Sequence, residues 1–388
     1  MCIMDLLAAG KRVLQTLNEA GYEAYFVGGM VRDQLIGRPI YDIDITTSAT
    51  PSVVMSLFEK TVATGLKHGT VTVMIDKIPV EVTTFRIEST YVDYRRPLEV
   101  QFTQSLDEDL RRRDFTMNAI AMDQNGCLHD PMGGLMDLKQ GRIVCVGQPA
   151  ERFCEDPLRI LRGVRFVAKL GFSIEKETLA AMKEASSLLE RISKERIKKE
   201  LEGMVQGDFF EKAINDAYEI DLMSAIPSFE GLNRYRYYCF QALTDPILLF
   251  ALAGLNRENL TEYFSSWPFS RVERKCIEVL CQAVHQSMEM RYFTYLYGEG
   301  WARRYHQLKL FLSQTNFPYE SVQLPITDRR QLAIDGKMIT KIIDRPKGPW
   351  IQELLRKLEY LVVMNQMENK TETLVEYVKQ EMEGVNYE

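Results

Sequence analysis

The sequence has few of the residues that build metal cages and disulfide frameworks. Its 388 residues include 4 histidines, and its 7 cysteines stand singly with no Cys-x-x-Cys pair. This spacing argues against a zinc site and against a disulfide scaffold. The longest apolar run, residues 247–255, is far shorter than the roughly 20 residues that a membrane-spanning helix needs, and no signal peptide precedes the first expected helix. We therefore expect a cytoplasmic protein that does not act on a membrane.

Positive charge is outnumbered by negative charge in total. The 48 Lys and Arg residues are outnumbered by 54 Asp and Glu, which gives a formal net charge of −6 and lowers the expectation of a nucleic-acid partner. The arginines are nevertheless concentrated, because residues 111–113 are three in a row and Arg159, Arg162 and Arg165 recur at every third position. Phosphate binding depends on a local basic face, so the net charge leaves a nucleic-acid partner open.

Hydrophobic periodicity predicts an α+β protein with two contrasting parts. The first 140 or so residues predict a mixed sheet with helices, whereas the chain from about Asp156 onward has the spacing of long helices. The composition, 46% hydrophobic and 26% charged, is that of a globular protein of two to three domains. The expected helices of the first part are residues 5–20 and 31–36, and its expected strands are residues 24–27, 41–45, 70–75, 80–85, 100–103 and 119–123.

Two acidic residues in the segment YDIDIT are the first candidates for chemistry. In a strand, the side chains of Asp42 and Asp44 point to the same face, so both carboxylates can converge on one site. Hard divalent cations prefer such oxygen ligands, and two metal ions can activate a hydroxyl and stabilise a leaving phosphate oxygen. Glu81, on a separate expected strand, is a third candidate ligand. An isolated Asp-x-Asp pair is more typical of a strand with exposed acids, so the neighbouring motifs must decide.

A glycine pair precedes these acids. Gly28 and Gly29 follow an apolar strand and begin an expected helix that contains Arg32. Bare backbone N–H groups at such a turn can hold phosphate groups. The alternative interpretation is an ordinary turn without a ligand, because a Gly-Gly pair is equally typical of such a turn.

Taken together, five ordered motifs resemble those of the family of class II tRNA nucleotidyltransferases and bacterial poly(A) polymerases, within the DNA polymerase β superfamily. The first is GGMVRDQLIGRPIYDIDITTSATP, which contains the glycines and the two acids. RRRDFTMNAIAM, DPMGGLMDLKQGRI, EDPLRILRGVRF and ISKERIKKEL resemble the second to fifth motifs, in the order that the family has them. A looser resemblance, over residues 334–374, extends to the tail of bacterial CCA-adding enzymes.

The resemblance implies roles for the residues of the first two motifs. Asp42 and Asp44 would be the catalytic residues and would bind Mg²⁺, and Gly28, Gly29 and Arg32 would lie against the nucleoside triphosphate. In the second motif, Arg113 matches a nucleotide contact and Asp114 matches the position credited with ribose recognition, a role for which a carboxylate suits because it accepts hydrogen bonds from hydroxyls. An arginine run at the surface, followed by a capping Asp, is the alternative interpretation of this segment.

The fourth motif implies a way to choose the nucleotide. In the family, the residues matching Asp156 and Arg159 imitate the Watson–Crick edges of a base, while Arg162 and Arg165 match further nucleotide contacts. A carboxylate that accepts from an exocyclic amino group favours cytosine and adenine, because uracil and guanine present a carbonyl there. A solvated helix with ion pairs between neighbouring turns is the alternative.

The resemblance also implies a division of the chain. It predicts a catalytic head over residues 1–140, a helical neck for nucleotide recognition over 141–207, a helical body over 208–310 and a helical tail over 311–388 that binds tRNA at its acceptor and TΨC arms. Residues 86–102 resemble the flexible loop of the family. Enzymes that add only C have a shortened loop, so its full length here argues against an enzyme that adds only C. The expected activity is therefore Mg²⁺-dependent addition of C, C and A to the tRNA 3′ end from CTP and ATP. An A-adding enzyme, a poly(A) polymerase and a non-catalytic RNA-binding module are the alternatives.

Overall fold

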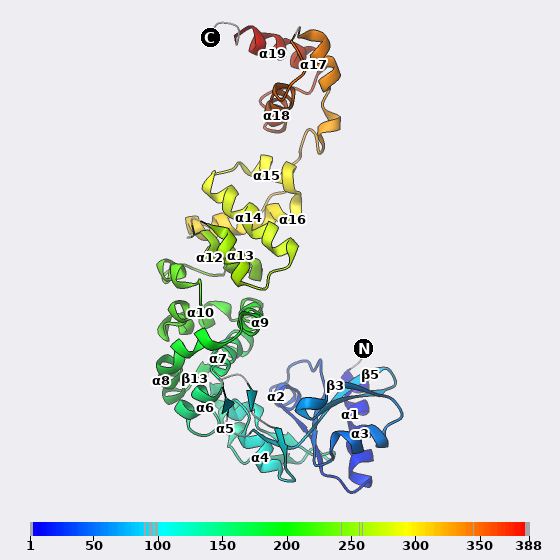
Figure 1. Ribbon diagram of the computed structural model, residues 1–388. Helices are drawn as coiled ribbons and strands as arrows, with labels where there is room; N and C mark the ends of the chain where they lie inside the picture. Colours follow the sequence, from blue (N-terminus) through cyan, green and yellow to red (C-terminus); the bar gives the residue numbers. More distant parts are fainter. Residues whose placement is uncertain are drawn as a thin grey trace. The chain divides into compact units, whose positions relative to one another are not determined.

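The computed structural model describes residues 3–88, 91–92, 96–97, 100–241, 243–255, 257, 259–343 and 345–384. The chain divides into two compact units (Figure 1). The first comprises Met1–Tyr237 and Ser266–Pro268, and the second comprises Tyr238–Ser265 and Phe269–Glu388. The finer division into head, neck, body and tail remains a prediction.

The first unit begins with a mixed sheet of seven strands in the order β11-β10-β1-β2-β5-β4-β3. Within this sheet β2 and β5 run parallel, and the other neighbouring strands run antiparallel. The mixed sheet that the sequence predicts is confirmed. The strands are β1 (Ala24–Val27), β2 (Asp44–Thr47), β3 (Thr61–Gly65), β4 (Thr70–Ile75), β5 (Ile78–Thr84), β10 (Ala121–Met122) and β11 (Leu128–His129).

Helices pack on this sheet and short helices connect its strands. Helix α1 buries Val13, Leu14 and Leu17, and both α1 and α3 pack against the sheet (Figure 1). Burying such a leucine stabilises the fold by about 1.5–3 kcal/mol. The helices are α1 (Ile3–Glu19), α2 (Gly29–Leu35), α3 (Pro51–Leu57), α4 (Leu106–Arg111) and α5 (Gly134–Gln140), with single 3₁₀ turns η1 (Leu66–His68) and η2 (Thr116–Asn118).

Four of the expected strands differ from those observed, and the strand expected over 100–103 ends one residue earlier, at Phe102. The strand expected over 41–45 begins only at Asp44, because β1 pairs with residues 45–47 and β5 pairs with residues 44–47, so the residues before Asp44 lack a continuous ladder. The strand expected over 80–85 begins two residues earlier, at Ile78, because the hairpin turn at residues 76 and 77 lies directly before it. The strand expected over 119–123 is the two-residue β10.

The predicted flexible loop over 86–102 lies partly outside the described residues, namely at 89–90, 93–95 and 98–99. Its described residues form two antiparallel pairs of short strands. These are β6 (Arg86–Glu88) with β9 (Val100–Phe102), and β7 (Tyr91–Val92) with β8 (Arg96–Pro97). The role of this loop therefore stays a prediction.

The rest of the first unit is helical, as the sequence predicts, and is built around α7. This helix begins just after Pro157 and ends at Gly171, whose φ of 73° suits a glycine at a helix end. It packs against α9 and α10. The elements are α6 (Pro149–Glu155), α7 (Leu158–Leu170), α8 (Lys176–Ala185), α9 (Lys194–Val205), α10 (Phe210–Glu219) and α11 (Leu222–Ala225), with 3₁₀ helices η3 (Ser186–Arg191) and η4 (Glu230–Tyr235) and the parallel pair β12 (Arg142–Ile143) and β13 (Ser173–Ile174).

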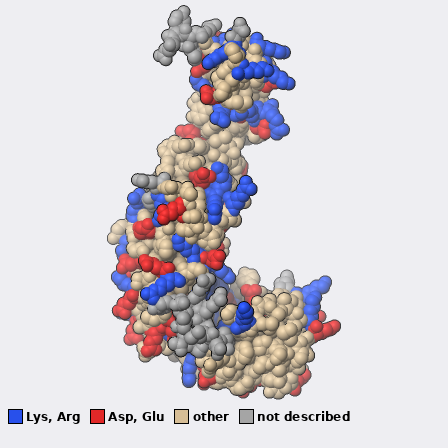
Figure 2. Space-filling view, in the orientation of Figure 1, with Lys and Arg blue, Asp and Glu red and all other residues tan. Residues whose placement is uncertain are grey.

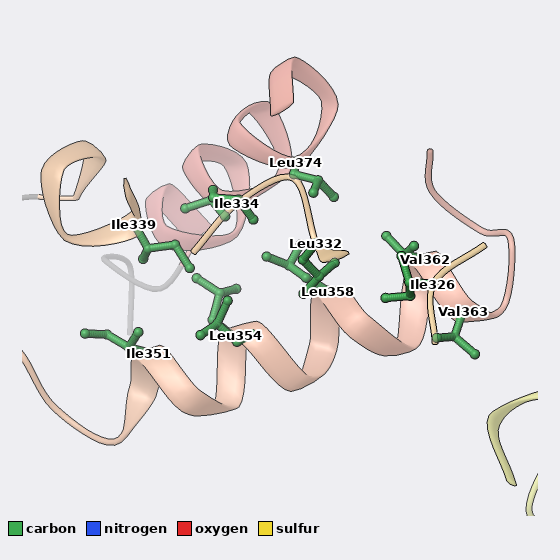
Figure 3. Packing of buried hydrophobic residues seen from close by; sticks show 12 residues of the cluster. Ile326, Leu332, Ile334, Ile339, Ile351, Leu354, Leu358, Val362, Val363 and Leu374 are labelled. Carbon is green, nitrogen blue, oxygen red and sulfur yellow. The ribbon is translucent and has the colours of Figure 1, made fainter. Parts of the chain in front are cut away.

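The second unit is helical in all its described regular elements apart from the 3₁₀ turn η5 (Arg329–Gln331). Its C-terminal core joins Ile339 of α17, Leu354 and Leu358 of α18 and Leu374 of α19, whose side chains point toward one another (Figure 3). Among the described residues, no helix combines the length and the apolar character that crossing a membrane requires. The helices are α12 (Pro246–Leu255), α13 (Leu260–Ser266), α14 (Arg271–His285), α15 (Met290–Tyr297), α16 (Glu299–Ser313), α17 (Gly336–Ile342), α18 (Trp350–Val363) and α19 (Thr371–Gly384).

Candidate active site

A cavity of about 480 Å³ in the first unit contains the predicted nucleotide-binding residues. Every residue assigned to the nucleotide by the sequence lines it, and so does Asp44. Asp42 and Glu81 are exposed and do not line the cavity. The lining residues are Gly28, Gly29, Arg32, Asp44, Arg112, Arg113, Asp114, Asn118, Asp156, Leu158, Arg159, Arg162, Arg165, Phe166, Lys169 and Arg196.

Negative charge is concentrated around Asp44. In the parallel pair of strands β2 and β5, Asp44 lies opposite Glu81, and side chains at paired positions project to the same face. Burial, followed by the negative charge of Glu81, raises the pKa of Asp44 to about 6, to which Asp42 also contributes. A divalent cation would relieve this repulsion, so the acidic groups fit a metal ion.

The metal ligands would have to be completed by other oxygens. Within the described part of the chain, no group of three or more His, Cys, Asp and Glu side chains is gathered so that it could hold a metal ion by itself. Mg²⁺ usually keeps several waters and binds proteins through one or two carboxylates together with substrate phosphates. A divalent cation beside Asp44 would therefore take further oxygen ligands from water or from a phosphate.

Gly28 brings the backbone close to both Asp44 and Arg113. Its φ of 68° is a conformation that favours glycine, and it precedes the first residue of α2. A Cβ atom at this position would lie 3.3 Å from Nη1 of Arg113 and 3.7 Å from Oδ2 of Asp44. A larger residue here would therefore intrude between the acidic and basic groups of the cavity.

The position of Arg113 is set by a buried carboxylate, that of Asp109 on α4. Oδ2 of Asp109 accepts a hydrogen bond of 3.1 Å from Nη2 of Arg113, and Oδ1 accepts one of 2.8 Å from Nε of Arg112. Although burial alone would raise the pKa of Asp109, the two guanidinium groups lower it. Thr46 of β2 also donates to Asp109, so this carboxylate ties the arginines to the strand that carries Asp44.

Three protein donors orient the carboxylate of Asp114. Its Oδ1 accepts from the backbone N–H of Phe115 at 2.8 Å and from Nδ2 of Asn118 at 3.0 Å, and its Oδ2 accepts from Nε of Arg162 at 2.8 Å. Burial opposes the charge, but Arg162 and these hydrogen bonds hold the pKa of Asp114 well below its usual range. A carboxylate oxygen has two lone pairs. Asp114 is therefore ionised and oriented by its neighbours at the wall of the cavity.

Three guanidinium groups surround the ring of Phe166 on α7. The central carbon of the guanidinium lies 5.1 Å from the ring centroid for Arg32, 5.7 Å for Arg162 and 4.8 Å for Arg165. The face of an aromatic ring attracts cations. Phe166 thus helps to keep three like charges together in a cavity suited to a polyphosphate.

The predicted base-reading pair lies where α6 gives way to α7. Asp156 accepts from the backbone N–H of Leu158 at 3.1 Å through Oδ1 and from Nη2 of Arg196 at 3.0 Å through Oδ2. Arg159 is buried, and it donates to Glu155 and to the backbone carbonyls of residues 152 and 112. Each oxygen of Asp156 still has acceptor capacity for an amino group. Glu155 holds Arg159 in place.

Sequence reasoning missed several residues that shape the cavity. Asp109, Asn118, Phe166 and Lys169 each contact a predicted site residue or line the cavity. Asp109, Asn118 and Phe166 fall inside or beside the matched motifs, so their position in the sequence was the available signal. The contacts Asp109–Arg113 and Asp114–Asn118 span only four residues, whereas Arg32 and Phe166 are far apart in the sequence, so their contact needed the structure.

Comparisons with known proteins assign the chain to a family. The poly A polymerase head domain matches residues 24–144, the probable RNA- and SrmB-binding site of polymerase A matches residues 171–232, and the putative domain 2 of tRNA nucleotidyltransferase matches residues 246–378. The chain is 40% identical to a CCA-adding enzyme of Bacillus cytotoxicus, over 95% of this chain and 97% of that protein. It is 38% identical to one of Bacillus cereus, over 97% and 99%.

Solved structures give the same result. The crystal structure of the Bacillus stearothermophilus CCA-adding enzyme in complex with CTP is similar with a TM-score of 0.80 and 32% identity, covering 98% of both chains. The Thermotoga maritima CCA-adding enzyme complexed with tRNA shares the fold, with a TM-score of 0.66 and 21% identity over 98% of this chain and 99% of that chain.

Proposed function

The chain belongs to the CCA-adding enzyme family of nucleotidyltransferases, and from that membership we propose that it adds C, C and A to the 3′ end of tRNA. The nucleotides would come from CTP and ATP, without a nucleic-acid template. The observation that carries this proposal is that one cavity holds Asp44 together with the base-reading pair, Asp156 and Arg159. A single site then serves both nucleotides, and the substrate would place the enzyme in the cytoplasm.

The reaction would join the 3′ oxygen of the tRNA to the α-phosphorus of the triphosphate and break the bond to the β-phosphate, releasing pyrophosphate. Asp42 and Asp44 would hold Mg²⁺, with Glu81 as a further candidate ligand. When bound, Mg²⁺ supplies activation of the attacking hydroxyl and neutralisation of the leaving oxygen. Arg32 and Arg113 would bind the phosphates, and the protein would contribute mainly by alignment and by fixed positive charge.

The nucleotide would be selected by hydrogen bonds with its sugar and base. Asp114 would accept from the ribose hydroxyls, and Asp156 would accept from the amino group of cytosine or adenine while Arg159 donates to the ring. Arg162 and Arg165 would help to place the nucleotide through the cation cluster around Phe166.

The tRNA would be held by the helices beyond the cavity. In the C-terminal segment, the exposed residues include Arg330, Lys337, Lys341, Arg345 and Lys347, and Figure 2 shows Lys and Arg gathered at this end of the chain. Basic side chains neutralise RNA phosphates without reading sequence. This supports a role of residues 311–388 in holding the acceptor and TΨC arms.

Three tRNA transcripts test the proposed function, one ending at the discriminator base, one after C and one after CC. Each is incubated with the protein, Mg²⁺ and CTP, ATP or both, and the products are resolved at single-nucleotide resolution. Completion of all three to CCA, followed by a stop, is the expected result. Growth of only the CC-ended transcript by one A would instead indicate an A-adding enzyme, and long A tails would indicate a poly(A) polymerase.

A further inference from the structure

One buried amide links the two ends of the cavity that the proposed function assigns to phosphate and to ribose. Asn118 lies at the end of the 3₁₀ turn η2 and is 6% exposed. Its Oδ1 accepts a hydrogen bond of 2.7 Å from Nη1 of Arg32, and its Nδ2 donates one of 3.0 Å to Oδ1 of Asp114. The arginine has no acceptor and the ionised carboxylate has no donor, so the amide can satisfy both neighbours in one orientation only.

The contacts of Asn118 belong to a chain of hydrogen bonds that starts and ends on α7. Lys169 donates to Oδ2 of Asp33 at 3.1 Å, and Oδ1 of Asp33 accepts from Nε of Arg32 at 2.8 Å. On the other side of the amide, Asp114 accepts from Arg162. Positive and negative side chains therefore alternate along this series of hydrogen bonds. Asn118 is its neutral member and lies between a cation, Arg32, and an anion, Asp114.

We propose that Asn118 is a positioning residue that orients Arg32 and Asp114 together, so that phosphate binding and ribose recognition depend on one amide. This inference rests on the proposed function, in which Asp114 recognises the ribose. Without the Asn118 donor, Oδ1 of Asp114 keeps only the backbone N–H of residue 115 and its carboxylate can turn toward Arg162. The 2′-hydroxyl of a nucleotide would then lose a correctly aimed acceptor.

The substitution N118D tests this directly. The aspartate has nearly the same shape and still accepts from Arg32, but it replaces the donor facing Asp114 by an acceptor. The matched control is T116V, in the same 3₁₀ turn: it removes a buried hydrogen bond of 2.7 Å to Asp137 and leaves the Asn118 amide intact. Thr116 does not line the cavity. The readout is the ratio of the dissociation constants for CTP and 2′-deoxyCTP, measured by calorimetry on the full chain without turnover.

We expect N118D and D114A both to weaken CTP binding about tenfold or more, as for the loss of a hydrogen bond to a charged group, and to change 2′-deoxyCTP binding less. The discrimination between the two nucleotides would then narrow in both variants and stay wild-type in T116V. Unchanged discrimination in N118D, with discrimination lost in D114A, would overturn the positioning role alone. Discrimination retained in D114A would show that the ribose assignment of the proposed function is wrong, and this inference would fall with it.

A purely structural role of Asn118 would change the unfolding midpoint and leave the discrimination between CTP and 2′-deoxyCTP unchanged. If N118D and T116V lowered the unfolding midpoint equally and changed the binding of both nucleotides by the same factor, Asn118 would be a packing residue and the proposal would be wrong. Wild-type discrimination in T116V despite a lowered midpoint is the expected contrast.

Discussion

Asp44 on β2 lies opposite Glu81 on β5 in a parallel pair of strands, in the register Asp44–Glu81, Ile45–Val82. Two acids at paired positions repel each other, and this repulsion adds to the burial that raises the pKa of Asp44. The local fold is therefore less stable with both groups ionised than it would be without one of the charges. A bound cation, as in the proposed function, would relieve this repulsion.

The first prediction concerns Asp44 itself. We expect D44N to reduce the incorporation of both C and A by about a hundredfold or more, because the cation loses a ligand. The unfolding midpoint should stay the same or rise, since the substitution removes a repelling charge. Incorporation is measured with labelled CTP and ATP, and tRNA binding by filter retention should persist. The control is D76N, an exposed aspartate in the β4–β5 turn, and normal turnover in D44N would contradict the metal assignment.

The second prediction concerns Asp109. We expect D109N to weaken CTP and ATP binding about tenfold, because Arg112 and Arg113 lose their shared buried carboxylate. Breaking a buried ion pair on one side also lowers the free energy of unfolding by about 3–5 kcal/mol. Calorimetry measures the binding and urea titration the stability.

The matched control for Asp109 is D137N. Asp137 is also a buried carboxylate that pairs with an arginine, Arg142, at 2.7 Å, but it does not line the cavity. D137N should therefore lower stability and preserve nucleotide binding. Equal losses of binding in the two variants would show that Asp109 acts only through general stability.

The third prediction concerns the choice of nucleotide. We expect D156N to admit UTP and GTP, because an asparagine can donate to the carbonyl that these bases present where cytosine and adenine have an amino group. Each of the four nucleotides is supplied alone to a transcript ending at the discriminator base. The exposed E184Q on α8 is the control, and strict selection of C by D156N would refute the base-reading role.

The fourth prediction concerns how stability depends on pH, through a residue outside the cavity. Burial, with Glu219 nearby, raises the pKa of Asp216 on α10 from 3.8 to about 6. The folded state therefore holds a proton that the unfolded state has already released, so this group's contribution to stability is present below pH 4 and is lost as the pH rises through 6. The urea midpoint of D216N relative to the wild type should rise across this interval. A difference that is constant from pH 4 to 7 would contradict the shift.

The sequence predicted elements best where local chemistry decides them. The strand over 70–75 was predicted to the residue, because its apolar alternation ends at Asp76 and Lys77, which adopt φ values of 48° and 69° in the hairpin turn. The start of β2 was wrong because the neighbouring strands, and not the residues themselves, decide where the ladder begins.

Most of the predicted site residues line one cavity, but the contacts between them were not predicted. The ordered motifs brought Arg32, Asp114 and Arg162 forward as candidates, and the cavity contains all three. That Asn118 contacts Arg32, 86 residues away in the sequence, depends on tertiary packing, which no local pattern encodes. Packing likewise decides that Tyr235 is buried while Tyr237, two residues later, is 93% exposed.

Helix α7 carries both Arg162 and Lys169, which are two turns apart and grip Asp114 and Asp33, respectively. Helix α7 thus contacts both α2, through Asp33, and the segment before η2, through Asp114. A rotation of α7 would displace Arg162 and Lys169 together and so act on both carboxylates. Arg32 and Asn118 connect these two carboxylates by hydrogen bonds. A continuous set of hydrogen bonds therefore joins the two ends of the cavity to the same helix.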